Sequence, residues 1–411
     1  MKPVEEQLEL IRRGTDQVEP LNELRKKLER SFASGKSLRI KYGIDPTGID
    51  VHLGHTVPLR KLRLFQELGH QAVLIIGNYT ALVGDPSGRD QTRARLTPEQ
   101  VEANARDYLT QVSKVIDISR TEVRSNGEWF GRFTFLDVLS LTSKTTVQRM
   151  LERDDFALRF NKRPESVPIY LHECLYPLMQ GHDSVEVRAD VELGGSEQLF
   201  NLMMGRRLQE ANGQEPQVCL TLPILRGLDG ARKMGKSLAN YVGVGENPVE
   251  QFGKIMSIPD SLMKEWFELL TDRSTDEIAR LIDGQTTHPM AAKKALGAEI
   301  VGFYSGPAGA AHAQAEWEKQ FSQRLDPSEM PEAVISRSAV QYRDGKVGIL
   351  RLLVAAGLAK SNNEARQKTL EGAVNFGPDR TRANDPKAEI DVADGLVLRL
   401  GRHLRRIKLG D

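Results

Sequence analysis

The sequence has few cysteines, no long apolar run and no excess of either charge, and each scarcity excludes a class of protein. Cys174 and Cys219 are its two cysteines, so neither a disulfide framework nor a thiolate metal cluster is available. No apolar stretch approaches the roughly 20 residues that span a membrane. The N-terminal "MKPVEEQLELIRRG" has acidic residues where a signal peptide has its apolar segment. We therefore expect a reduced, cytoplasmic protein with no membrane partner.

Length and charge balance bound the domain organisation. The 57 basic and 56 acidic residues argue against a general nucleic-acid coat but leave room for a local basic patch. A chain of 411 residues is too long for one ordinary core. From Leu38 onward, strand, loop and helix patterns alternate, which predicts a parallel α/β sheet. We predict a helical segment over 1–35, an α/β domain over 36–230, a loop and helical domain over 231–325, a linker over 326–344 and a small C-terminal domain over 345–411.

The stretch "DVHLGHTVPLRKL" places His52 and His55 three residues apart, with Gly54 between them, where a loop becomes a helix. A zinc site would need a third ligand, and no motif brings another histidine nearby. A pair that only caps the helix is a second alternative. A phosphate site is a third, because helix N-termini beyond a strand offer free N–H groups to anions and Gly54 allows close approach to the backbone.

A second stretch, "GLDGARKMGKSLANY", places Lys233 and Lys236 three residues apart after a predicted strand. The pair is either a solvated basic loop or a mobile cationic loop that closes over a polyphosphate. In the second case the two ammonium groups would stabilise charge on a leaving pyrophosphate.

These two stretches resemble known signatures. "HLGH" is similar to the HIGH signature and "KMGKS" to the KMSKS signature of class I aminoacyl-tRNA synthetases, and their order matches that class. More specifically, the chain resembles the bacterial tyrosyl-tRNA synthetase family over nearly its whole length. The further stretches that carry this resemblance are "YGIDPTG", "LVGDPSGR", "YPLMQGHDS", "ADVELGGSEQLFN" and "SNNEARQKTLEGAVNFG", the last of which resembles an S4-type RNA-binding module.

The resemblance implies a fold and an activity. The fold is α/β: a Rossmann-like catalytic domain with a connective insertion, a helical domain facing the anticodon stem, and a small α+β S4-like domain. In the implied reaction, tyrosine and ATP give tyrosyl-adenylate and pyrophosphate, and the tyrosyl group then moves to the terminal ribose of tRNA(Tyr). ATP is a substrate that brings Mg²⁺ with it, so no metal held by the protein is expected. A homodimer is implied by the family alone.

The resemblance also implies which residues act. The implied catalytic residues are Thr47, His52, His55, Lys233 and Lys236. The implied ATP-binding residues are these histidines and lysines together with Gly54, Gly194, Gly195, Glu197 and Ser237. The implied tyrosine-binding residues are Lys41, Asp45, Asp85, Tyr176, Gln180, Asp183 and Gln198. Among them, Tyr176, Gln180 and Asp183 have the four- and three-residue spacing that puts them on one helix face, although an ordinary amphipathic helix shows the same spacing.

Three positions depart from the usual pattern of the family. Lys41 stands where many relatives have a tyrosine that touches the substrate hydroxyl, Glu197 where they have aspartate, and Gly235 where they have the serine of KMSKS. Lys41 and Tyr42 alternate along a strand, so only one of them can face the pocket. Our hypothesis is that Lys41 and Asp183 together contact the hydroxyl.

The C-terminal stretch has a local basic excess. From Val340 to Asp411 there are 14 basic and 9 acidic residues, as RNA contact requires, although a solubilising tail is an alternative. The expected RNA-binding residues are Arg366, Lys368, Arg402, Arg405 and Arg406. Two other functions stay open: a tryptophan-specific class I synthetase, and a non-catalytic RNA-binding protein on a synthetase scaffold.

Overall fold

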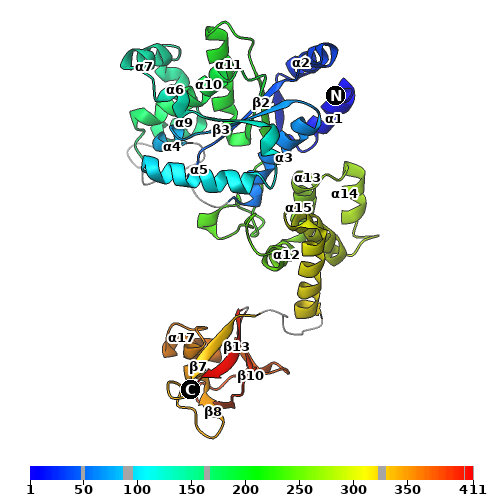
Figure 1. Cartoon of the computed structure of the whole chain (residues 1–411), viewed down its shortest axis with the longest axis vertical. Coiled ribbons are helices and arrows are strands. Elements are labelled where there is room, and N and C mark those ends of the chain that lie inside the picture. The colour runs from blue at the N-terminus through cyan, green and yellow to red at the C-terminus, as the bar shows by residue number, and fades with distance from the viewer. Residues whose placement is uncertain (48–50, 87–95, 162–166, 323–329, 402, 411) are drawn as a thin grey trace. The chain divides into compact units, whose positions relative to one another are not determined.

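The computed structural model describes residues 1–47, 51–86, 96–161, 167–322, 330–401 and 403–410. They form two compact units, Met1–Ala311 and His312–Asp411 (Figure 1). Within these residues, no helix is both long and apolar enough to cross a membrane.

The first unit is built on a six-stranded sheet in the order β1-β6-β5-β2-β3-β4. Strands β2 to β6 are parallel, as the sequence predicts, and β1 pairs with β6 in the antiparallel sense. β1 was not predicted, because its three residues lie inside a segment with helical periodicity. The strand bounds are β1 Gln17–Glu19, β2 Arg39–Ile44, β3 Gln71–Ile76, β4 Thr121–Ser125, β5 Val191–Gly195 and β6 Val218–Leu222.

Helices cover both faces of this sheet. α10 and α11 lie on one side of the sheet, and α5 lies on the other (Figure 1). The helices of the first unit, the last of which continues into the second, are α1 Val4–Arg12, α2 Leu21–Ser34, α3 Leu53–Glu67, α4 Thr80–Val83, α5 Pro98–Val112, α6 Gly127–Phe130, α7 Phe135–Thr142, α8 Val147–Met150, α9 Asp154–Asn161, α10 Tyr176–Glu186, α11 Leu199–Ala211, α12 Pro248–Met256, α13 Met263–Leu270, α14 Thr275–Ile282 and α15 Pro289–Trp317. α15 is kinked where Gly306 precedes Pro307.

The connectivity places a topological switch point beside β2. The chain runs from β2 to β3 on one side, then returns through the long β4–β5 connection to β5, on the other side of β2. In parallel α/β sheets, ligands bind at such a switch point, beyond the carboxyl ends of the strands. α6 to α10 lie in the β4–β5 connection, which is the predicted insertion.

α10 and α11 approach closely because each has a glycine at their crossing. A Cβ atom on Gly181 would lie 3.0 Å from the backbone nitrogen of Gly205 and 3.1 Å from the carbonyl carbon of Met204. A Cβ atom on Gly205 would lie 2.4 Å from Gln217 Nε2. The crossing therefore fixes the distance of α10 from the sheet.

The second unit is a small α+β domain, which agrees with the expected S4-like fold. Its five-stranded sheet has the order β10-β9-β12-β13-β7, and β11 pairs with β8. The core includes Leu352, Leu353, Leu398 and Ile407. The elements are β7 Glu332–Ser336, β8 Lys346–Gly348, α16 Ile349–Ala355, α17 Asn362–Leu370, β9 Val374–Phe376, β10 Thr381–Ala383, β11 Glu389–Asp391, β12 Val397–Leu400 and β13 His403–Gly410.

β7 lies inside the range 326–344 that composition predicts as a linker. It pairs in parallel with β13, so Ile335 faces Leu409 in the ladder. The prediction was wrong for Glu332–Ser336 because a partner more than 70 residues away in the sequence decides the structure there.

The Gly181 contact leads to a stability prediction. Gly181→Ala should lower the melting temperature and the free energy of unfolding, by about 1–3 kcal/mol, because α11 must move away. The matched control is Gly253→Ala in α12, where an added Cβ meets nothing within 4 Å. That variant should be more stable by up to about 1 kcal/mol, from helix propensity alone. Equal shifts of both variants in thermal unfolding would contradict the close contact.

Candidate active site

The predicted site residues gather at the carboxyl ends of β2 and β5. Asp45 and Thr47 follow β2, and His52 precedes α3. Gly194 and Gly195 end β5, and Glu197 and Gln198 form the short 3₁₀ turn Ser196–Gln198 that follows. α10 contributes Tyr176, Gln180 and Asp183. The sequence therefore brings the motifs to the crevice that the topology predicts.

His52 and His55 form a stacked pair at the start of α3. Their ring centroids are 3.7 Å apart, with an angle of 18° between the planes. The backbone N–H of His52 donates to Nδ1 of His55 at 3.3 Å. Burial lowers the pKa of His52 to about 3 and that of His55 to about 4, and the positive charge of Lys236 adds to both shifts. Both rings are therefore neutral at neutral pH, so each has one N–H that can donate a hydrogen bond and one nitrogen that can accept one.

A metal site would require more ligands around this pair. Among the described residues, no three side chains of His, Cys, Asp or Glu gather in a way that could hold a metal ion. The sequence analysis also considered that the histidine pair only caps the helix. His52 is indeed the N-cap residue of α3. An N-cap position and a ligand-binding position are compatible, because the free N–H groups of the first turn face the same side.

The two signature stretches meet in space. The positive charge of Lys236 acts on both histidines, and that of Lys233 acts on Glu197. Between the lysines, Met234 is buried and its N–H donates to the carbonyl of Leu225 at 2.9 Å. A Cβ atom on Gly54 would lie 3.6 Å from Cβ of Met234 and 3.0 Å from Cε1 of His52. Glycine at this position thus leaves room for the His52 ring, while Met234 of the lysine loop lies at ordinary contact distance from it.

The lysine loop is held by Asn240, a buried residue that the sequence analysis missed. Its Oδ1 accepts from the N–H of Gly235 at 2.9 Å. Its Nδ2 donates to Oδ2 of Asp229 at 2.9 Å and to the carbonyl of Lys233 at 3.2 Å. The loop is therefore a hydrogen-bonded turn in this structure, and its closure over a ligand stays a prediction. Ser237 is exposed in the same loop.

The glycines after β5 make room for side chains of the site itself. A Cβ atom on Gly195 would lie 2.4 Å from Oε2 of Glu197, and one on Gly194 would lie 2.8 Å from Cδ1 of Leu202. Burial raises the pKa of the Glu197 carboxyl. The Glu197 side chain thus folds back over Gly195.

Asp183 lies fully inside the protein with two donors. Nε1 of Trp129 donates to Oδ1 at 3.0 Å, and Nδ2 of Asn126 donates to Oδ2 at 3.4 Å. Burial raises the pKa of Asp183 to about 7, and the positive charge of Lys41 opposes that shift. Trp129 and Asn126 come from the start of the insertion and were missed, since nothing in their local sequence marks them.

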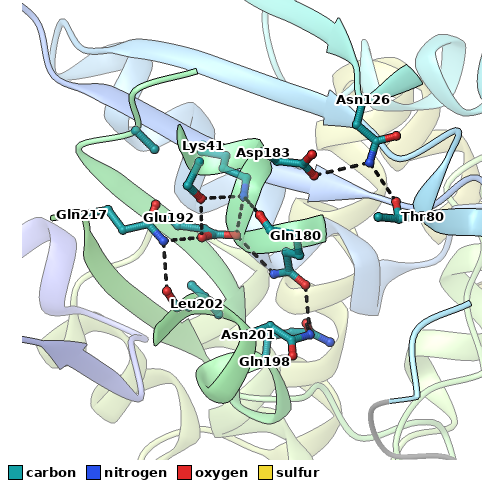
Figure 2. Close-up of polar contacts among 12 residues, drawn as sticks. Lys41, Thr80, Asn126, Gln180, Asp183, Glu192, Gln198, Asn201, Leu202 and Gln217 are labelled. Atoms are coloured by element: carbon teal, nitrogen blue, oxygen red, sulfur yellow. Dashed lines mark hydrogen bonds and ion pairs between the residues drawn. The ribbon is translucent and has the colours of Figure 1, made fainter. Parts of the chain in front are cut away.

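A second carboxylate, Asp45, is linked to Asp183 through two side chains. Tyr176 donates to Oδ2 of Asp45 at 2.9 Å, and Thr80 donates to its Oδ1 at 2.6 Å. Nδ2 of Asn126 donates to Oγ1 of Thr80 at 3.0 Å and also reaches Asp183 (Figure 2). A continuous chain of hydrogen bonds thus connects two of the predicted tyrosine-binding carboxylates.

A second chain of hydrogen bonds contains the remaining predicted pocket residues. Nε2 of Gln198 donates to Oδ2 of Asp85 at 2.7 Å. Nδ2 of Asn201 donates to Oε1 of Gln198 at 3.0 Å and to Oε1 of Gln180 at 2.9 Å (Figure 2). The buried Arg153 forms an ion pair with Asp85 at 3.4 Å. Asn201 and Arg153 were not predicted, although both complete the pocket.

Lys41 faces α10, as the hypothesis required, but its ammonium is fully engaged. Nζ donates to Oε1 of Glu192 at 2.8 Å, to the carbonyl of Gln180 at 2.7 Å and to Oγ of Ser184 at 2.7 Å. An ammonium has three N–H donors, so none is left for a substrate hydroxyl. The structure thus departs from the hypothesis of direct contact. Tyr42 lies on the opposite face, where burial raises its pKa and Tyr108 and Glu197 act on it.

The basic residues of the C-terminal unit do not all face one way. Ile407 lies in the core, so Arg405 points towards the core side of β13 and Arg406 towards the other side. Arg366 is exposed on α17, and Lys368 forms an ion pair with Glu371 at 2.7 Å. Arg402 lies outside the described residues.

Comparison with known proteins places the chain in a family. The sequence model of the family "tRNA synthetases class I (W and Y)" matches residues 33–322. The tyrosine–tRNA ligase of Moorella thermoacetica is 48% identical over 402 residues, which is 97% of this chain and 94% of that protein. The tyrosine–tRNA ligase of Aquifex aeolicus is 46% identical over 398 residues, 97% of each chain.

Solved structures show the same fold at lower identity. The tyrosyl-tRNA synthetase of Archaeoglobus fulgidus, solved with L-tyrosine, has a TM-score of 0.60 and 24% identity, covering 76% of this chain and 100% of that one. The truncated mitochondrial enzyme of Aspergillus nidulans has a TM-score of 0.63 and 22% identity, covering 78% and 95%. On the sequence matches, the chain belongs to the class I aminoacyl-tRNA synthetases and, within them, to the tyrosine–tRNA ligases.

Proposed function

We propose that this protein joins tyrosine to ATP, releases pyrophosphate, and transfers the tyrosyl group from the adenylate to the terminal ribose of tRNA(Tyr). The observation that carries the proposal is the contact between two motifs. A neutral histidine pair at a helix N-terminus lies against a loop with two lysines, at the same end of the sheet as the hydrogen-bonded cluster around the buried carboxylate Asp183. In-line displacement at phosphorus needs positioning and charge stabilisation rather than a protein nucleophile.

The amino acid occupies the pocket along α10. Asp183 accepts the hydrogen of the phenol, and Trp129 and Asn126 hold its carboxylate in place. Phenylalanine would leave this buried acceptor without its partner, which is costly. The ammonium group of the substrate binds at the other end, among Asp85, Tyr176 and Gln180, while Asp45 and Gln198 orient these groups.

ATP binds where α3 begins. His52 and Thr47 bind the leaving phosphates, His55 lies near the ribose, and Gly54 leaves space for the base. Lys233 and Lys236 approach the pyrophosphate from the loop, with Ser237 beside them. Glu197 binds the ribose, with Gly194 and Gly195 leaving the backbone open to the nucleotide. Mg²⁺ arrives with ATP, since hard divalent cations bind phosphates through few protein ligands.

The partners follow from the same function. The C-terminal unit contacts the tRNA backbone, and its exposed Arg366 and Lys408 are suited to phosphates. A second copy of the chain covers the insertion, because α7 alone exposes Phe135 by 77% and Leu136 by 73%. We infer from the similarity to bacterial tyrosine–tRNA ligases that the protein acts in the cytoplasm.

The two alternatives from the sequence are less well supported. A tryptophan enzyme could also use the buried carboxylate, as an acceptor for the indole N–H. What disfavours it is that relatives with 45–48% identity carry the name tyrosine–tRNA ligase. A non-catalytic RNA-binding protein would not need the neutral histidine pair and the lysine loop in contact.

The function predicts strict amino-acid dependence of ATP–pyrophosphate exchange. Tyrosine should support exchange, and phenylalanine should do so at a rate lower by orders of magnitude, because it has no hydrogen to donate to Asp183. Tryptophan should also be used poorly, because its bicyclic indole is larger than the phenol ring that the site is proposed to hold. The measurement is isotope exchange with each amino acid at equal concentration. Faster exchange with tryptophan would indicate the alternative enzyme, and no exchange with any amino acid would indicate the non-catalytic protein.

Loss of one loop lysine should slow the chemical step. Lys236→Met should lower the rate of adenylate formation on the order of a hundredfold, because one preorganised charge at the leaving group is lost, while tyrosine affinity stays unchanged. The control is Arg232→Met, which removes an equal charge from the same loop at a side chain that pairs with Asp229. Single-turnover kinetics measure both. Equal slowing in the two variants would mean that only the net charge of the loop matters.

Tyrosine binding should depend on pH through Asp183. Its pKa of about 7 in the free protein means that the ionised acceptor is lost as pH falls through that value. Tyrosine affinity should therefore rise roughly tenfold between about pH 6 and about pH 8, then level off. Asp183→Asn should bind tyrosine weakly with a flat profile over the same range. Calorimetric titration checks this, and a flat profile for the unsubstituted protein would contradict the role of Asp183.

A further inference from the structure

Lys41 and Glu192 form a fully buried ion pair between adjacent strands of the sheet. Their side chains are 0% and 1% exposed, and Nζ lies 2.8 Å from Oε1. β2 and β5 place the two residues opposite each other in the parallel ladder. Neither residue touches Asp183 or the histidine pair through a hydrogen bond among the contacts that the structure describes.

Stability alone does not account for this pair. The cost of removing two charges from water is often as large as the attraction between them, so a well-packed apolar pair would serve the fold equally well. The pair also makes hydrogen bonds with the side chains around it. Oε2 of Glu192 accepts from Ser184 at 3.0 Å and from Gln217.

The pair also makes two hydrogen bonds with Gln180. The Lys41 ammonium donates to its main-chain carbonyl at 2.7 Å, and Oε1 of Glu192 accepts from its Nε2 at 3.2 Å (Figure 2). A carboxamide can present either its oxygen or its nitrogen in a given direction. Because the Glu192 carboxylate can only accept, it takes the nitrogen of Gln180. The oxygen then points towards Asn201, at 2.9 Å, on the side of Gln198.

We propose that the Lys41–Glu192 pair is a positioning unit that sets the carboxamide of Gln180, so that its oxygen faces the ammonium group of the bound amino acid. The inference rests on the pocket assignment under Proposed function. An ammonium ion needs acceptors and is repelled by an amide NH₂. The pair thus acts on the substrate through Gln180, without contact of its own, and Lys41 fills the place of the usual tyrosine in another way.

The test replaces the pair without leaving a lone charge. Lys41→Met with Glu192→Leu removes both charges at similar volume, and Lys41→Met with Glu192→Gln restores one carbonyl acceptor for Gln180 Nε2. The probes are tyramine, which has the phenol and the ammonium, and 4-ethylphenol, which has the phenol alone. Their inhibition constants are measured against tyrosine in pyrophosphate exchange, after thermal melting has shown that each variant is folded.

The Met/Leu variant should bind tyramine about tenfold more weakly, as expected for a lost hydrogen bond to a charged group, with a change of less than about twofold for 4-ethylphenol. The Met/Gln variant should recover most of the tyramine affinity. In a Gln180→Leu background, the pair replacement should have no further effect on the tyramine-to-4-ethylphenol ratio. The control is Lys27→Met, which removes another buried lysine, paired with Asp190 at 3.3 Å, and should leave the ratio unchanged.

Each of the other outcomes would overturn the inference and would show which assumption failed. Equal weakening of both probes would mean that the pair only supports the fold, and an unchanged ratio in the Met/Leu variant would mean that Gln180 is set by other groups. If the unsubstituted protein catalyses exchange with tyrosine but does not prefer tyramine, the pocket assignment is wrong. If it catalyses no exchange with tyrosine, the proposed function itself fails.

Discussion

The three polar side chains that α10 turns towards the site each have a hydrogen-bond partner from elsewhere in the chain, and the rest of the site depends on these contacts. Tyr176, Gln180 and Asp183 are spaced so that they share one face of the helix. An unpaired buried polar group costs about 1–3 kcal/mol, and more when it is charged. The three side chains therefore draw partners from separate parts of the chain: Asp45 after β2, Glu192 on β5, and Trp129 in the insertion. The glycines at the α10–α11 crossing permit this by letting the helix lie close enough.

The topology of the sheet brings the second half of the chemistry to the same place. α3 starts beyond the carboxyl end of β2, and the turn after β5 lies alongside, so helix N–H groups and the carboxyl-end loops share one crevice. The lysine loop reaches it through the packing of Met234 on Gly54. As a result, a neutral imidazole pair and two ammonium groups lie at one end and a buried carboxylate at the other. This polarity matches a substrate with a phosphate chain at one end and a phenol at the other.

The sequence predicts much of this arrangement, for physical reasons that also set its limits. Residues such as His52, Lys236 and Asp183 can be predicted from the sequence, because each lies in a short motif whose spacing indicates a local structure. The partners of Asp183, which are Asn126 and Trp129, and the Arg153 partner of Asp85 are not found, because contacts between distant segments leave no local pattern. Position 41 illustrates both the strength and the limit of sequence patterns. Strand alternation predicts that Lys41 and Tyr42 point to opposite faces of the sheet. Because both faces of β2 are covered, alternation does not predict which residues each side chain contacts. A signal was present in Glu192, a charged residue between apolar neighbours in the predicted strand "VELGG", which indicates a buried partner of opposite charge.

A crystal structure of the protein with tyrosine and a non-hydrolysable ATP analogue tests the central claim most directly. The account predicts that the phenol oxygen lies within hydrogen-bond distance of Asp183 and the ammonium group within reach of the Gln180 oxygen. It also predicts that the phosphates lie at the start of α3, between His52 and the lysine loop. Tyrosine bound with its phenol away from α10, or a Gln180 carboxamide with its nitrogen towards the ammonium group, would contradict it.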